Sequence, residues 1–172
     1  MIMVQKFGAV VLNGRQPLHS EVQNMSVNVK QIAVQLKHVP GTLWQMTNVL
    51  AEHGISIRAL TVANSTDTST VRLIVDNVIY ASEVLKKAGF TLSFSSVLAT
   101  EIPNIPGGLN HVLEILKDGN VNIDYMYAVG EKFSPYSKNV CIVFNFTDNK
   151  HAADVLAAAG IRLLGHGDLS VL

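Results

Sequence analysis

Two short segments of the chain place a polar side chain, a turn and a helix start in the same order. His38-Val39-Pro40-Gly41-Thr42-Leu43 is the first, and Asn104-Ile105-Pro106-Gly107-Gly108-Leu109 is the second. Pro-Gly is a strong turn signal, and a helical pattern of apolar residues begins directly after each copy. The first N–H groups of a helix have no partner within the helix, and the helix dipole is positive at that end. Each segment could therefore bind a carboxylate.

The polar residues beside these turns could complete a site for a zwitterion. The carboxylate of a free amino acid suits the helix starts at Gly41-Thr42 and Gly107-Gly108, where glycine lets a ligand approach the backbone. Its ammonium group needs acceptors, which asparagine side chains and carbonyl groups at strand ends supply. Binding of some amino acid in the micromolar range, about −8 kcal/mol, is the expectation. The alternative is that both segments are only tight strand-to-helix turns.

Hydrophobic periodicity predicts the elements around the first segment. Ile32, Val34 and Leu36 alternate with more polar neighbours, which indicates a half-buried strand. Apolar residues then follow helical spacing from Leu43 to Leu50, and Gly54 ends that helix. Further elements are predicted as strands over 55–63, 71–75 and 90–98 and a helix over 81–88.

The second segment is followed by the same order of elements. A helix is predicted over 109–116, then a strand that begins at Val121-Asn122-Ile123 and aligns with Ile55-Ser56-Ile57. A longer turn over 130–139, a strand over 140–147, a helix over 150–159 and a strand over 161–164 complete the repeat.

The repeated order βαββαβ predicts an α+β protein of two ferredoxin-like units, each an antiparallel sheet with helices on one face. We expect an N-terminal extension over 1–26, which adds an edge strand or mediates dimerisation, and units over 27–98 and 99–172. Because the last strand of the first unit runs almost directly into the first strand of the second, the units are expected to pack closely.

Residues 27–172 resemble a tandem pair of ACT domains. The resemblance rests on the two Pro-Gly segments, on Leu50 to Ile57, on Val71 to Asp76 and on Val121 to Tyr127, and it occurs twice in register. In that family the turn before the first helix and the start of the second strand contact the ligand. Carried over, the ligand-binding residues of the first unit are His38, Val39, Gly41, Thr42, Leu43 and Ser56. Those of the second unit are Asn104, Ile105, Gly107, Gly108, Leu109 and Asn122.

The second unit fits the family pattern better than the first. Asparagine is the commoner choice at the positions of His38 and Ser56, and the second unit has Asn104 and Asn122 there. The resemblance implies a non-catalytic regulator that binds a free amino acid as effector where ACT domains meet. It also implies a homodimer, an enzyme of amino-acid metabolism as a further partner, and no cofactor.

Composition excludes several other classes. Lys plus Arg and Asp plus Glu number 13 each, so net charge does not favour nucleic acid or an anionic membrane as partner. No apolar run approaches the roughly 20 residues that span a bilayer. Cys141 is the only cysteine, which rules out an intrachain disulfide and favours the cytoplasm. The six histidines lack metal-ligand spacing.

Three other functions compete with the regulator. A small enzyme on this fold would need a nucleophile or an acid–base pair, and no such grouping stands out in the sequence. RNA-binding sheets of the same order stack bases on aromatic residues, but 31–35 and 71–75 contain none. An oligomerisation module without a ligand is the third. Trp44 is expected to pack in the core, with a dimer contact as the alternative, and Tyr125 and Tyr127 are expected to pack on the sheet.

Overall fold

One long strand, β4 (Thr91–Pro103), belongs to both repeats in the computed structural model, which describes residues 27–129 and 138–170. Its first part, Thr91 to Val97, pairs with β1, and its second part, Leu98 to Pro103, pairs with β6. The expected unit boundary after residue 98 therefore falls inside a continuous strand, next to the position where one partner strand replaces the other.

The remaining elements follow the predicted order. They are β1 (Val29–Lys37), α2 (Thr42–Glu52), β2 (Ile57–Asn64), β3 (Thr68–Val75), α3 (Val78–Lys87), α4 (Gly108–Asp118), β5 (Ile123–Ala128), β6 (Asn139–Phe146), α5 (Asn149–Ala158), β7 (Leu163–Leu164) and α6 (His166–Ser170). All strand pairs are antiparallel, and the sheet order is β2-β3-β1-β4-β6-β5, with β7 also paired to β4.

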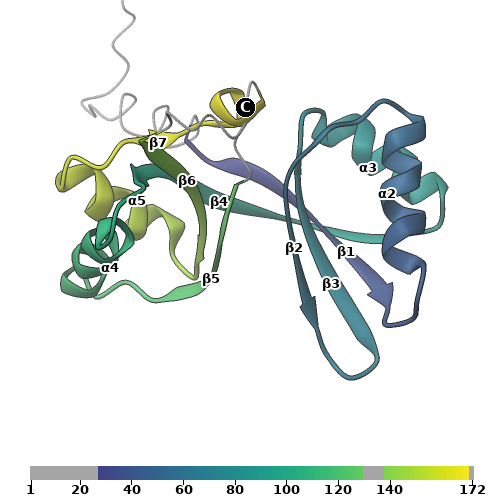
Figure 1. The fold of residues 1–172 in the computed structure, drawn as a ribbon, viewed down its shortest axis with the longest axis horizontal. Helices are drawn as coiled ribbons and strands as arrows, with labels where there is room; N and C mark the ends of the chain where they lie inside the picture. The colour runs from purple at the N-terminus through teal and green to yellow at the C-terminus, as the bar shows by residue number, and fades with distance from the viewer. Residues whose placement is uncertain (1–26, 130–137, 171–172) are drawn as a thin grey trace, which may run out of the picture.

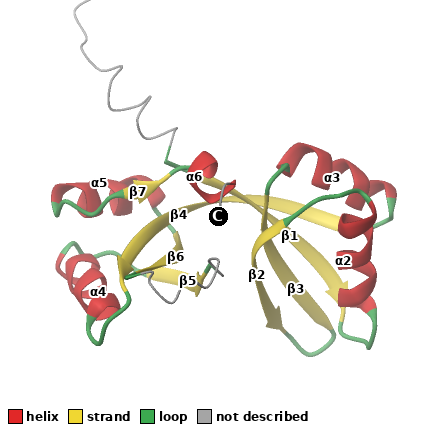
Figure 2. Ribbon diagram, turned by 45° about the horizontal axis from the view of Figure 1, so that its top comes forward, coloured by secondary structure: helices red, strands yellow, loops and turns green. Residues whose placement is uncertain are grey.

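The sheet is curled, so that its two ends face each other and the helices lie outside (Figures 1 and 2). We call the helix-covered side the outer face and the opposite side the inner face. Helices α2 and α3 cover the part of the outer face that β1, β3 and the start of β4 form, and α4 and α5 cover the second unit. Two α+β units with helices on one face are thus confirmed.

Three apolar clusters hold this arrangement together. The first lies under α2 and α3 and includes Ile32, Met46, Leu50, Leu73 and Leu85. The second lies under α4 and α5 and includes Leu98, Leu116, Phe144 and Leu156. The third lies on the inner face, where Ile74 and Val97 of the first unit pack with Val143 and Leu169 of the second. Close packing of the two units, expected from the short connection between them, is confirmed by this third cluster.

A buried polar contact also joins the two units on the inner face. Gln31 of β1 is fully buried, and its Nε2 donates to Ser95 Oγ (2.8 Å) and to the hydroxyl of Tyr125 (2.6 Å). The Tyr127 hydroxyl donates to Gln31 Oε1 (2.6 Å), and the Arg72 guanidinium lies 4.1 Å from the centre of the Tyr125 ring. Burial raises the pKa of Tyr127 above its usual range. Both tyrosines therefore pack on the sheet as predicted, and they contact the opposite unit.

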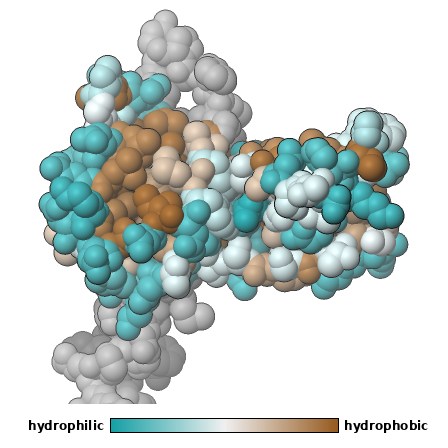
Figure 3. All heavy atoms as spheres, turned by 90° about the horizontal axis from the view of Figure 1, so that it is seen from below, coloured by the Kyte–Doolittle hydropathy of each residue, from teal (hydrophilic) through white to brown (hydrophobic). Residues whose placement is uncertain are grey.

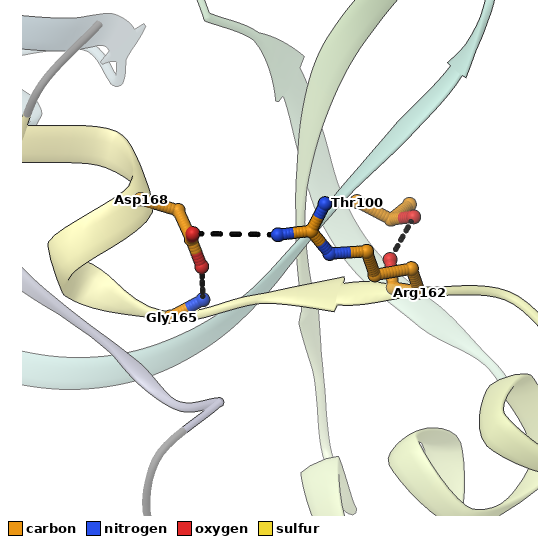
Figure 4. Close-up of polar contacts among 4 residues, drawn as sticks. All are labelled: Thr100, Arg162, Gly165 and Asp168. Atoms are coloured by element: carbon orange, nitrogen blue, oxygen red, sulfur yellow. Dashed lines mark hydrogen bonds and ion pairs between the residues drawn. The ribbon is translucent and has the colours of Figure 1, made fainter.

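The C-terminal segment pairs with β4 through β7 and is held by one side-chain hydrogen bond to that strand and by polar contacts of its own (Figure 4). The Thr100 hydroxyl donates to the Arg162 carbonyl oxygen (2.7 Å), and the N–H of Gly165 donates to Asp168 (2.8 Å), which also pairs with the Arg162 guanidinium (3.5 Å). The predicted strand over 161–164 is shortened at its start to Leu163–Leu164, and the chain then turns at Gly165 into α6, which the sequence pattern did not indicate.

The prediction that Trp44 packs in the core is wrong, because 67% of its surface is exposed. Met46 and Leu50 are the buried residues of α2, and Trp44 lies two positions before Met46, about 200° around the helix. The extension over 1–26 and most of the turn over 130–139 lie outside the described residues. Among the residues that are described, no helix is long and apolar enough to cross a membrane.

Candidate ligand site at the first Pro-Gly turn

The first Pro-Gly turn ends in a helix start whose N–H groups are open. Gly41 has a φ of 90°, which favours glycine, and α2 begins at Thr42. The Thr42 hydroxyl donates to the carbonyl oxygens of Lys37 (2.9 Å) and Val39 (3.0 Å), which fixes the turn. Within the described part of the chain, the N–H groups of Leu43 and Trp44 have no acceptor. They are the donors that a bound carboxylate would use.

His38 is held in place by a chain of side-chain hydrogen bonds from the β2–β3 hairpin. The Ser69 hydroxyl, which is buried, donates to Asn64 Oδ1 (2.8 Å) and lies 3.0 Å from His38 Nδ1. A hydroxyl has one hydrogen, so Ser69 accepts from the Nδ1–H of His38. In the tautomer that carries its hydrogen on Nδ1, Nε2 is an acceptor. The ring is therefore oriented by two strands that lie far from it in the sequence.

A cavity of about 420 Å³ lies beside this turn. Its lining includes His38, Val39, Gly41, Thr42 and Leu43, which are predicted site residues, together with Asn64 and Ser69 and apolar residues of β1, β2 and β3. The structure thus brings together five of the residues predicted in the first unit. Asn64, Ser69, Val62 and Val71 were missed, because only the strand register places them beside the turn.

Ser56 does not belong to this cavity. It follows the opposite end of α2, whose 11 residues span about 16 Å. Its N–H donates to both carboxylate oxygens of Asp76, at 3.2 Å each, so it has a structural role at the start of β2. Asn122 has the corresponding place in the second unit, in a shallow cavity of about 310 Å³ between the end of α4 and β5.

The second Pro-Gly turn is built differently from the first. Gly107 has a φ of 87°, like Gly41, but Gly108 takes the place of Thr42 and lies directly on the end of β4. A Cβ at Gly108 would overlap the carbonyl oxygen of Pro103. This contact explains the second glycine without any ligand. The N–H of Asn104 donates to the Lys138 carbonyl oxygen (2.8 Å).

The other predicted residues of the second turn are divided between surface and core. Ile105 is 65% exposed, whereas Leu109 packs against the second apolar cluster.

The predicted site residues lie away from the contact between the two units of one chain. The first turn instead lies at an exposed border that we call the α2–β2 edge, formed by Val39, Leu43, Trp44, Leu60 and Val62. These apolar residues are between 38% and 67% exposed, and β2 is the last strand of the sheet that the described residues form.

In the second unit, apolar residues also gather at the surface (left in Figure 3). Two ACT-type units could therefore contact each other at these turns only if they belong to different chains.

The described residues contain no group of three or more His, Cys, Asp or Glu side chains that could hold a metal ion. Cys141 is buried in β6. The site is thus a small cavity with backbone donors, an oriented imidazole and apolar walls. Such a site can bind a small polar molecule.

The chain belongs to the ACT domain pair family, whose match covers residues 27–172. The resemblance seen in the sequence is confirmed, and the two ferredoxin-like units are the two ACT domains of that pair. No curated protein matches the chain.

Solved structures share this architecture. Protein BT0572 from Bacteroides thetaiotaomicron is similar with a TM-score of 0.78 and 29% identity, and the match covers 85% of this chain and 98% of that one. The regulatory subunit of aspartate kinase from Thermus thermophilus, in its ligand-free form, has a TM-score of 0.56 and 14% identity over 78% of this chain and 91% of that one. The corresponding subunit from Thermus flavus has a TM-score of 0.53, 14% identity and coverage of 76% and 92%. At this identity the aspartate kinase subunits show the fold alone.

Proposed function

We propose that this protein is a non-catalytic cytoplasmic regulator that binds a free amino acid at the first Pro-Gly turn. The supporting observation is the cavity that His38 and Leu43 line together, beside the helix start at which the N–H groups of Leu43 and Trp44 have no acceptor among the described residues. The effector's carboxylate accepts from the two N–H groups at the positive end of α2. Its ammonium group donates to Nε2 of His38 and to carbonyl oxygens of the turn.

The second turn is proposed as a second, weaker site. It has the same backbone conformation at Gly107, and Asn104 supplies a side-chain carbonyl where the first turn has His38. The close contact of Gly108 with Pro103 leaves the helix start without the hydroxyl that braces the first turn. Occupancy there is therefore expected only at higher effector concentration.

We further propose that two chains associate through the α2–β2 edge. Trp44 is the most exposed residue of that edge, and β2 is an outermost strand of the sheet that the described residues form, so its outer side can pair with a further strand. A stable interface needs about 800 Å² from each partner, with aromatic residues near its centre. A second copy at this edge would cover Val39 and Leu43 and close the cavity. The effector would then stabilise the dimer, and an enzyme of amino-acid metabolism would respond to that change.

Calorimetry and thermal unfolding with each of the twenty amino acids test the effector site. We expect at least one to bind in the micromolar range and to raise the unfolding temperature. His38→Ala should weaken that binding roughly tenfold, because it removes a hydrogen-bonding partner of the ligand. His53→Ala is the matched control, since His53 lies at the other end of α2, where its Nδ1 is 2.8 Å from the Val49 carbonyl oxygen and its ring packs against Tyr80. Absence of heat and of any thermal shift with all twenty would refute the proposal.

An oligomerisation module without a ligand is the second candidate, and the exposed apolar edge favours it as much as it favours a ligand-dependent dimer. Light scattering with and without amino acids separates the two functions. A dimer that Trp44→Lys dissociates, and that no amino acid stabilises, would support the module over the regulator.

A further inference from the structure

We infer that the effector of the first turn has an uncharged, apolar side chain of about the size of leucine or methionine, and that a basic amino acid is rejected. This inference rests on the proposed function of the same site and adds the chemical class of its ligand. It is drawn from the composition of the cavity wall.

The wall opposite the helix start is mostly apolar. Val71 is fully buried and Leu36 is 5% exposed, so both belong to the first core and form a fixed floor. Val39, Leu43 and Val62 are 53%, 39% and 39% exposed and line the sides. A ligand whose carboxylate is bound at α2 would extend its side chain toward β2 and β3, where it meets Val62 and Val71. The two polar side chains of that wall, Asn64 and Ser69, bond to each other and to His38.

The charges around the cavity are unsuited to a basic ligand. Among the described residues that line the cavity, Lys37 and His38 are titratable and none is an aspartate or glutamate. Asp67 touches the turn through its main-chain carbonyl oxygen, which accepts from the N–H of His38 (3.1 Å), and its carboxylate does not line the cavity. The ammonium or guanidinium group of a lysine or arginine effector would lose water and gain no counter-ion.

An acidic side chain is disfavoured for a different reason. Its carboxylate could reach Lys37 only at the rim, whereas the floor at Val71 and Leu36 would desolvate it. A volume of about 420 Å³ lies near the lower end of the usual range for small-molecule sites, about 300–1,000 Å³. It accommodates an aliphatic side chain, and each methylene group that contacts the wall adds to affinity.

The first test is a calorimetric series with the full-length protein and leucine, methionine, alanine, lysine and aspartate. Leucine and methionine should bind, and alanine should bind roughly 50-fold more weakly than leucine because it lacks three methylene-equivalent groups. Lysine and aspartate should give no measurable heat. Preferential binding of lysine or aspartate would overturn the inference while leaving the proposed function in place. Absence of binding by any amino acid would overturn both.

The second test changes the wall. Val62→Asp places a carboxylate inside the cavity and should shift preference from leucine toward lysine by at least tenfold. Leu60→Asp is the matched control, because Leu60 lies on the same strand with the same exposure (38%) but does not line the cavity. Because both residues lie on the α2–β2 edge, any effect on association is common to the two variants and changes both affinities alike, so Leu60→Asp should leave the ratio of leucine to lysine affinity unchanged. Circular dichroism checks that both variants fold. An equal change of the ratio in both variants would show that Val62 is not in contact with the effector side chain.

Discussion

Replacement of Tyr127 by phenylalanine tests whether the buried contact around Gln31 holds the two ACT domains together. The Tyr127 hydroxyl donates to Gln31 Oε1 at 2.6 Å, and Gln31 is fully buried. Without the hydroxyl, Oε1 loses a partner that water cannot easily replace. An unsatisfied buried polar group costs about 1–3 kcal/mol, so Tyr127→Phe should lower the free energy of unfolding by that amount. Urea denaturation followed by far-ultraviolet circular dichroism measures the change.

The double variant Gln31→Leu/Tyr127→Phe sharpens this test. It removes both members of this hydrogen bond, and replacing a buried pair by apolar groups is nearly neutral. Ser95 and Tyr125 also lose the Gln31 amide, but both are only partly buried, so water can replace it. The double variant should therefore recover part of the stability that Tyr127→Phe alone loses. Tyr80→Phe is the matched control, since Tyr80 is 42% exposed on α3 and its hydroxyl has no partner in the described structure. A loss below about 0.5 kcal/mol for Tyr127→Phe, or an equal loss for Tyr80→Phe, would refute the reasoning.

Three further predictions follow from the structure. Gly108→Ala should destabilise the protein by about 1–3 kcal/mol in urea denaturation, because the new Cβ overlaps the Pro103 carbonyl, and no loss of stability would contradict that packing. Stability should fall as the pH rises above about 10, the ordinary pKa of tyrosine, because the folded state holds the Tyr127 proton more tightly than the unfolded state does. This fall should be smaller in Tyr127→Phe, and an identical alkaline profile in both proteins would exclude Tyr127 as its source. Ser69→Ala should weaken effector binding about fivefold in calorimetry by releasing the His38 ring, whereas unchanged affinity would show that the ring needs no support.

Local pattern was enough to predict most of the fold. Alternation at Ile32, Val34 and Leu36 and helical spacing from Leu43 to Leu50 reflect the periods at which side chains return to one face. The two Pro-Gly turns were found for the same reason, since φ near +90° at Gly41 and Gly107 is a local requirement.

The features that were missed depend on contacts between distant segments. Sequence spacing placed Trp44 beside the apolar stripe, but the breadth of the sheet beneath α2 decides how much of that helix is covered. Asn64 and Ser69 orient His38 only because the β1–β3 register brings Ser69 opposite Leu36. The hydrogen bonds of Gln31 with Tyr125 and Tyr127 form only because the curled sheet brings the inner faces of the two units together.

The continuous strand β4 couples the two ACT domains, because it is part of the sheet of both. Its 13 residues, at about 3.3 Å each, extend over about 40 Å and run from the sheet of the first domain into that of the second without a break. Because the same strand pairs with β1 and with β6, a change in its orientation in one domain would also move the sheet of the other. Neither domain can be excised cleanly, because a cut at the boundary divides β4 and exposes the third apolar cluster, to which both domains contribute.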